Sequence, residues 1–581
     1  MHIPGATPAD AGHRAGSFGA LRTTEVDGIP TLYVESPQSL TAMLSFRVGV
    51  ADETLVSRGI THLVEHIAMH ELVDSSVSCN AQVGPLVTDF FVQGAPEDVS
   101  GFLNALVRWF REPDLGSSEH ERSILEAESR QRANGIFDLH TRFRFGAMGF
   151  GLVGYGEFGL ARISEDDLRE WIGTRFVGAN AVLALTGPPP MGLDMALPTG
   201  ERQQVPRMVA IPPNPPYYFA GPEGMVSASG LFRRAELSSL VGDITSNAVT
   251  ERLRKEQGAS YGSSHHMERV DADNLVLMVS ADLNADPALP VARNATSTLH
   301  REVMRLSASG PTPEELRNAR TPLLRQLDDD LTRVWQAFSG ATAVLRGTDP
   351  WTHEEARDAI ADADSDTLRE SFGELARSLI VASPCADRAM TTLPFTNGIV
   401  PAPAAVGGTE FRPVGAPADQ SILQVGTQVL EIRGPGTLHR ASYDDIVAYE
   451  RYPDGARVVW TKYGNTIGVE SAAWRDSGKI ATSLDDRIDR SLWVDREART
   501  DIPHAREFML SRADRYWYAL NRPWARALVY GLIAVILGAA VAVSHLLGLV
   551  LSLTVVGVAR YVERRLKRKI AEAERKEANA S

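Results

Sequence analysis

Two histidines and a glutamate in the stretch GITHLVEHIAMHEL, residues 59 to 72, have the types and spacing of a metal site. His62 and His66 are four residues apart, so on a helix both imidazoles project from one face and can share an ion. Glu65 lies between them, where a carboxylate can act as a general base. His70 is one further turn along, which leaves open which two histidines bind. The alternative is an apolar core helix that happens to carry histidines.

The elements around this stretch form two similar blocks. Residues 17 to 200 alternate strand-like and helix-like patterns, and residues 205 to 395 repeat the plan after a proline-rich crossing. In the second block the sequence predicts a strand at 225–233, a helix at 236–257 and a strand at 274–283. The fold class is therefore predicted to be α+β, with two homologous αβ domains.

Four stretches that follow one another in the first block resemble a known family. They are RGITHLVEHIAMHE, VSCNAQVGPLVTDFFVQGAPEDV, HERSILEAESR and YGEFGLARISEDDLREWIGTRFVGANAVLALTG. Together they are similar to the M16 inverzincins, the zinc peptidase family of pitrilysin, insulin-degrading enzyme and mitochondrial processing peptidase, over residues 17 to 395. The resemblance implies that His62 and His66 bind one Zn²⁺ and that Glu65 is the general base. His70 has no counterpart in the motif and is expected to be a bystander.

The resemblance also implies a third zinc ligand and a substrate-binding strand. The family's third ligand is a glutamate on a later helix, with a second glutamate seven residues before it. Glu128 and Glu121 have that spacing, which makes Glu128 the expected ligand and Glu121 its support. Glu126 is the rival ligand, although it would face about 160° away from Glu128 on a helix. Asn80 and Ala81 match the family's edge strand and are expected to contact substrate.

The second block lacks the His-x-x-Glu-His motif, as expected for the family's inactive partner domain. Its stretch LRKEQGASYG resembles the family's Arg and Tyr, so Arg254 and Tyr261 are expected to bind substrate carbonyls and stabilise the oxyanion. Family chambers contain four such domains, whereas this chain has two. Within one chain these residues would lie on the wrong wall for a shared substrate, so we expect a head-to-head homodimer.

Two further motifs carry less weight. Residues 149–154, GFGLVG, fit a Gly-x-Gly-x-x-Gly pattern, but no strand and no helix start bracket them, so a dinucleotide site is not expected. His265 and His266 lack a partner carboxylate at helical spacing. We interpret them as part of the surface or of a cleft wall.

The remaining segments are predicted to be linkers and one small module. Residues 1–16 are predicted to be a disordered lead without the apolar core of a signal peptide. Residues 396–420 form a Pro, Ala and Gly-rich linker. Residues 421–500 are predicted to be β-rich, with a hairpin at Asp454-Gly455, and are similar to a PH-like barrel. Residues 501–526 are predicted to be juxtamembrane.

The C-terminal end carries a long apolar stretch. Residues 527 to 559 contain no Asp, Glu, Lys or Arg and as one helix would be about 50 Å long, against a hydrocarbon core of about 30 Å. Basic residues flank both ends: Arg522, Arg526, Arg560, Arg564, Arg565, Lys567, Arg568 and Lys569. Positive charge marks the cytoplasmic side, so we predict a transmembrane helical hairpin with cytoplasmic peptidase domains and a basic cytoplasmic tail at 560–581.

Composition excludes other classes of function. The net charge is −14, and no basic stripe appears before residue 500, so no nucleic-acid partner is expected. Cys79 and Cys385 are the only cysteines, which excludes a disulfide framework and a thiolate zinc site. The sequence therefore predicts a membrane-anchored zinc metalloendopeptidase for unfolded peptides. The alternative is an inactive M16-like membrane scaffold.

Overall fold

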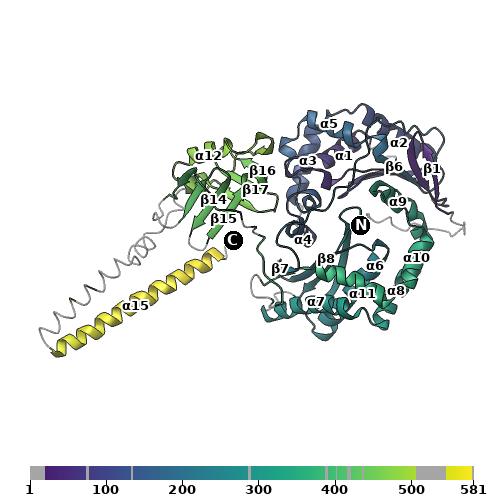
Figure 1. The fold of residues 1–581 in the computed structure, drawn as a ribbon. Helices are drawn as coiled ribbons and strands as arrows, with labels where there is room; N and C mark the ends of the chain where they lie inside the picture. Colours follow the sequence, from purple (N-terminus) through teal and green to yellow (C-terminus); the bar gives the residue numbers. More distant parts are fainter. Residues whose placement is uncertain are drawn as a thin grey trace.

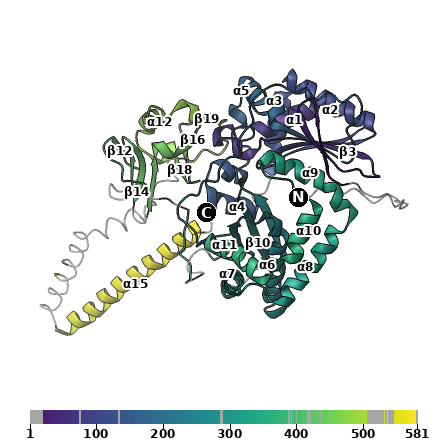
Figure 2. The ribbon, with the colours of Figure 1, turned by 45° about the vertical axis from the view of Figure 1, so that its right-hand side comes forward.

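The chain forms two αβ domains, a β-rich module at their side and a long C-terminal helix that projects from the rest of the molecule (Figures 1 and 2). The computed structural model describes residues 20–72, 77–131, 135–284, 289–385, 390, 392–398, 400, 402–414, 421–434, 437–504, 531, 535 and 545–578. The predicted lead at 1–16 and most of the juxtamembrane segment at 501–526 lie outside these residues.

The first domain is a six-stranded sheet with helices on its outer face (Figure 1). The strand order is β1-β2-β6-β3-β5-β4, in which only β2 and β6 pair in parallel. The strands are Arg22–Val26, Ile29–Tyr33, Leu40–Phe46, Ser78–Val83, Thr88–Gly94 and Ala181–Leu185 for β1 to β6. The outer helices are α1 (Ile60–Leu72), α2 (Pro96–Arg111), α3 (Ser118–Gln131) and α5 (Glu165–Arg175). The strand β4 is left at the edge, next to α1.

The second domain repeats this plan with a five-stranded sheet of order β7-β11-β8-β10-β9. Its strands are Tyr217–Ala220, Met225–Phe232, Ser260–Arg269, Leu275–Leu283 and Ile380–Ser383 for β7 to β11. Its covering helices are α6 (Ser238–Thr250), α7 (Leu289–Ser309), α8 (Pro313–Leu327), α10 (His353–Asp362) and α11 (Ser365–Arg377). The last strand of each sheet pairs in parallel with an early strand, β6 with β2 in the first sheet and β11 with β7 in the second. In both sheets the hairpin after the first long helix begins with the edge strand, β4 or β9. The helix α6 is thus the counterpart of α1 without its motif.

One helix from each block packs against the sheet of the other domain. The helix α9 (Asp330–Arg346) comes from the second block but packs on the inner face of the first sheet, where Phe338 and Ala341 bury against Leu32 and Val182. The helix α4 (Ile136–Phe145) comes from the first block but packs its Leu139 side on the second sheet. This reciprocal exchange buries apolar surface across the domain boundary and fixes the two domains together.

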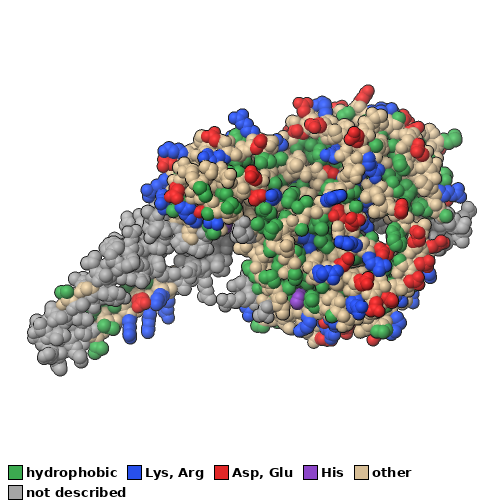
Figure 3. Space-filling model, in the orientation of Figure 1, with side chains coloured by type: hydrophobic (Ala, Val, Ile, Leu, Met, Phe, Trp, Pro, Cys, Tyr) green, Lys and Arg blue, Asp and Glu red, His purple; other side chains and the backbone are tan. Residues whose placement is uncertain are grey.

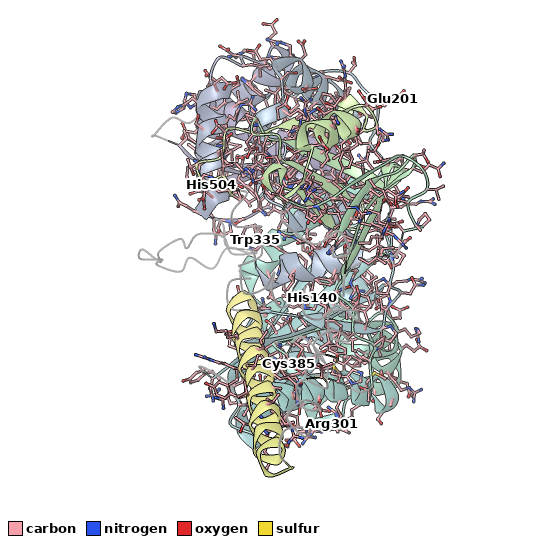
Figure 4. All side chains as sticks on the ribbon, turned by 90° about the vertical axis from the view of Figure 1, so that its left-hand side faces the viewer. His140, Glu201, Arg301, Trp335, Cys385 and His504 are labelled. Atoms are coloured by element: carbon pink, nitrogen blue, oxygen red, sulfur yellow. The ribbon has the colours of Figure 1, made fainter. Side chains whose placement is uncertain are left out.

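A buried polar cluster lies at the same boundary. His140 on α4 is 1% exposed, and its two ring nitrogens bond the hydroxyls of Ser229 at 2.9 Å and Ser227 at 2.8 Å. Arg144, one turn later, donates to the carbonyls of Ser229 and Ser378 at 2.7 Å each. Figure 4 shows His140 between the upper and lower domains. Burial lowers the pKa of His140 to about 3, so the ring is neutral.

The β-rich module, residues 421–504 together with the strand β12 (Thr409–Phe411), contains two four-stranded sheets around its own core. The first sheet joins β12 to β13 (Ile422–Val425), β14 (Val429–Gly434) and β15 (Thr437–Ser442). The second contains β16 (Ile446–Arg451), β17 (Arg457–Thr461), β18 (Thr466–Val469) and β19 (Trp493–Asp495), with α12 (Ser477–Asp485) preceding β19. The hairpin β16–β17 turns at Asp454-Gly455, where Gly455 has φ +88°.

The C-terminal helix α15 (His545–Ala578) projects from the rest of the molecule; it starts at the far tip, and its C-terminal end lies close to the other domains (Figure 1). It joins the end of the apolar stretch to the basic tail in one continuous helix, and its basic side chains are visible in Figure 3. Of the predicted hairpin at 527–559, residues 527–530, 532–534 and 536–544 lie outside the described residues. Among the residues that are described, no helix combines the length and the apolar character needed to cross a membrane.

Candidate metal centre

The helix α1 presents the histidines from one side and buries the other. Leu63, Val64 and Ile67 are fully buried against the first sheet, while His62 and His66 stay partly exposed. The amphipathic pattern of the sequence thus gives the helix its orientation. The two imidazole rings lie edge to face with centroids 4.9 Å apart.

The start of α1 is fixed by a buried carboxylate. Glu53 accepts hydrogen bonds from the backbone N–H groups of Gly59 and Thr61, both at 3.0 Å. These N–H groups have no partner inside the helix, and a carboxylate at this N-terminal end also interacts favourably with the helix dipole. Arg58 pairs with the same carboxylate at 3.2 Å. Gly59 has φ +108°, a conformation that favours glycine and turns the chain into the helix.

Three candidate ligand atoms converge above this helix. One atom each of His62, His66 and Glu128 lie within 4.8 Å of one another. Glu128 comes from α3, which packs alongside α1. Glu126, the rival considered from sequence, is not part of this group, in agreement with the angle of about 160° that separates it from Glu128 on a helix. Two imidazoles and a carboxylate are a donor set that suits Zn²⁺ and leaves a coordination position for water.

Each histidine is oriented by a carboxylate on its other nitrogen. Glu121 lies 3.0 Å from Nδ1 of His66, and Glu157 lies 3.1 Å from Nδ1 of His62. A carboxylate acceptor at Nδ1 places the proton there and leaves Nε2 as the free lone pair, which is how metal-binding histidines are usually held. Glu121 was expected from its spacing. Glu157 was not, although it lies within the stretch YGEFG that carries the family resemblance.

The carboxylate of Glu65 faces both Nε2 atoms. Its Oε2 lies 3.8 Å from Nε2 of His62 and 3.9 Å from Nε2 of His66. Glu65 is 7% exposed, and this burial raises the pKa of its carboxyl although the two imidazoles oppose the rise. Burial acts in the same direction on Glu157, but the hydrogen bond to His62 and the charge of Arg58 lower the pKa of Glu157 to about 2.

His70, expected to be a bystander, contacts the carboxylate that orients His66. Its Nδ1 lies 2.7 Å from Oε1 of Glu121, so this carboxylate joins His66 to His70. One ligand atom each of His70, His120 and Glu121 also lie within 4.8 Å of one another, on the exposed end of α1. His70 is not part of the group formed by His62, and its contact is with the supporting glutamate.

The substrate residues expected on the edge strand lie beside α1. Asn80 and Ala81 are in β4, which pairs with β5 on one side and ends the sheet on the other. Asn80 is exposed, whereas Ala81 packs towards the core under α1. A small cavity of about 120 Å³ separates the end of this strand from His62 and Glu157. The edge, the cavity and the histidines therefore form one continuous surface.

Arg254 and Tyr261 lie in the second domain. Arg254 is exposed in the π-helical turn Glu251–Glu256 after α6, and Tyr261 is 79% exposed at the start of edge strand β9. Within the described part of the chain, no hydrogen bond or ion pair joins either side chain to the histidines of α1. The structure does not bring these residues to the metal group of the same chain.

The two motifs set aside in the sequence have structural roles. Residues 149–154 form a short 3-10 helix against α4. His265 lies 3.8 Å from Asp243, and His266 packs on the ring of Phe137 at 4.4 Å. Burial lowers the pKa of both imidazoles, in agreement with a position in the wall of the domain boundary.

Comparison with known proteins was made at the level of sequence and of structure. No family model and no curated protein matches this chain. A protease from Helicobacter pylori is 12% identical with a TM-score of 0.51, covering 63% of this chain and 99% of its own. The peptidase M16 inactive domain from Pseudomonas fluorescens is 11% identical with a TM-score of 0.51, and the match covers 62% of this chain and 97% of that domain's chain. The first half of the periplasmic protease PqqL from Escherichia coli is 14% identical with a TM-score of 0.50, and the match covers 65% of this chain and 95% of the PqqL chain.

The two αβ domains have the M16 peptidase fold. The similar structures include a protease and an inactive M16 domain, so the fold alone leaves activity undecided. What the site adds to the M16 fold is the converging donor set and the two carboxylates that orient it.

Proposed function

We propose that the chain is a zinc metallopeptidase that hydrolyses peptides in an extended conformation. The observation that carries the proposal is the convergence of His62, His66 and Glu128, with Glu65 facing both imidazole Nε2 atoms. An inactive scaffold has no need for two buried carboxylates that hold both histidines in one tautomer. The donor set fits zinc, which would be held by these three residues.

Zinc, when bound, supplies a Lewis acid that lowers the pKa of water to about 7 and polarises a peptide carbonyl. The protein supplies the proton transfers. Glu65 accepts the water proton at its carboxylate and passes it to the leaving amine, and its raised pKa helps it to hold that proton between the two transfers. Glu121 and Glu157 hold the imidazoles so that Nε2 faces the ion.

The edge strand β4 is the proposed substrate platform. An extended peptide that adds to β4 would pair with its free backbone groups and pass beside α1. Asn80 would contact its side chains, whereas Ala81 leaves room next to the helix. A folded protein cannot present such a strand, so the substrate class is unfolded peptides.

We further propose that the working unit is a homodimer anchored to a membrane. Arg254 and Tyr261 are exposed and belong to the other domain, so a second copy facing the first is the simplest way to place them over His62. The apolar stretch 527–559 with its basic flanks is the support for a membrane hairpin with both ends cytoplasmic. Anchoring both copies in one membrane would favour pairing.

The test is zinc content and cleavage of an unstructured fluorogenic peptide by the purified chain. The wild type is expected to carry one zinc per chain and to cleave the peptide. The Glu65→Gln variant should retain zinc and lose about 10²- to 10⁴-fold in kcat, because the base is removed and the ligands remain. A wild-type chain that binds no zinc and cleaves nothing would instead favour the inactive scaffold.

A further inference from the structure

The β-rich module is packed directly against the segment that carries Glu157. Its Ala448 and Val494 share a hydrophobic cluster with Leu152 and Tyr155 of the first domain, and Val153 and Phe158 border the same cluster. Glu157 lies between Tyr155 and Phe158 in sequence, so the residues on either side of this carboxylate are covered by the module. We call residues 152–160 the Glu157 segment.

Two module side chains hold the Glu157 segment. The ring of Trp460 lies 6.1 Å from that of Tyr155 and 5.3 Å from that of Phe158, both edge to face. Arg496 donates to the carbonyl of Phe158 at 3.2 Å and stacks over its ring at 4.4 Å. Glu450, buried inside the module, accepts hydrogen bonds from both Trp460 and Arg496, which fixes the two side chains relative to each other.

The backbones of the two units also meet closely. The N–H of Ala147 donates to the carbonyl of Lys462 at 2.9 Å. Gly146 has φ +69°, and a Cβ at this position would lie 2.1 Å from the same carbonyl oxygen. In return, a Cβ on Gly464 of the module would lie 2.8 Å from the hydroxyl of Tyr155. A residue without a side chain on each side of the contact indicates a fixed docking geometry.

On its other side, the Glu157 segment contacts the metal helix. Glu157 lies 3.1 Å from Nδ1 of His62 and 3.9 Å from Nη2 of Arg58, and Arg58 donates to the carbonyl of Leu152 at 3.2 Å. The segment is therefore held between the module and α1. Moving the backbone at Phe158 would move the carboxylate that orients His62.

We propose that the β-rich module is a positioning device for the metal site, acting through Arg496 and Trp460 on the Glu157 segment and through Glu157 on His62. This inference rests on the proposed function. Without the module, the orienting carboxylate is expected to become mobile and His62 to bind zinc less well. Loss of an orienting carboxylate typically weakens metal affinity by roughly 10- to 100-fold.

The test compares two arginines of the same module in the full-length chain. Arg496→Ala removes the contact with Phe158, whereas Arg499→Ala removes ion pairs to Asp454 and Glu470 that lie wholly within the module. Zinc affinity is measured by competition with a chelator. Arg496→Ala should weaken it towards the value of Glu157→Gln, and Arg499→Ala should leave it unchanged. In the Glu157→Gln background, Arg496→Ala should add nothing, because both changes act through one carboxylate.

A second readout needs no metal. Amide hydrogen exchange of the Glu157 segment in the zinc-free protein should speed up in Arg496→Ala and not in Arg499→Ala. Wild-type zinc affinity in Arg496→Ala, or additive losses with Glu157→Gln, would overturn the inference. A wild-type chain that binds no zinc would overturn the proposed function, and hydrogen exchange alone would then decide whether the module holds the segment.

Discussion

The neutral, buried His140 at the domain boundary makes the stability of the paired domains depend on pH. Its pKa is lowered to about 3 in the folded chain, whereas a histidine in an unfolded chain has a pKa of about 6.5. Between these values the unfolded state binds a proton that the folded state excludes, so the stability falls as the pH falls below about 6.5. From pH 7 to pH 5 this one group should remove about 2 kcal/mol from the free energy of unfolding.

The contribution of His140 is isolated by a His140→Gln variant, whose amide can bond Ser227 and Ser229 but does not titrate. Urea unfolding of both proteins at pH 7 and pH 5 gives four free energies of unfolding. All other titrating groups affect both proteins alike, so the wild type should lose about 2 kcal/mol more than the variant over this interval. Equal losses in the two proteins would show that the imidazole takes up its proton in the folded state and that this reasoning is wrong.

Three other expectations concern the site and its assembly. Glu128→Gln should lose zinc while Glu126→Gln keeps it, and zinc measurements with the opposite outcome would reverse the ligand assignment. Mixing an inactive Glu65→Gln chain with an inactive Tyr261→Phe chain should restore up to about a quarter of the sites if dimers mix at random. No recovery despite demonstrated mixing would mean that each chain works alone. Reporter fusions at the two ends of the chain should both report the cytoplasm, and opposite sides would indicate a single membrane span.

The local elements of the two αβ domains could be predicted from the sequence because each has a periodic signal. The strand and helix expected at 225–233 and 236–257 correspond to β8 and to α6 with its π-helical turn. The choice of Glu128 came from the resemblance to the M16 family, whose ligand glutamate follows a second glutamate by seven residues, and helical phase only separated it from Glu126. The structure places one atom of Glu128 within 4.8 Å of atoms of His62 and His66. Local patterns of this kind depend on neighbours within about two turns.

The exchange of α4 and α9 between the domains could not be predicted. An amphipathic pattern shows that a helix buries one side, but it carries no information on which of two similar sheets will receive it. The polar cluster of His140 and Arg144 makes this choice specific, because its partners are hydroxyl and carbonyl groups of the second sheet. In Figure 4, His140 and Trp335 mark the two exchanged helices near the boundary. The decision depends on tertiary packing alone.

Glu157 was missed for a related reason. Its partner His62 is 95 residues away, and the segment around Glu157 is irregular, so neither helical nor strand periodicity directs the side chain. The conformation of the segment is set from outside, by Trp460 and Arg496 of a module that begins more than 250 residues later. Motif spacing identifies groups that lie on one regular element, whereas this carboxylate is placed by the contact between two units. An orienting residue of this kind can be identified only from a structure in which the module is packed against the first domain. Through the same contact the module can influence the position of Glu157 and thereby of His62.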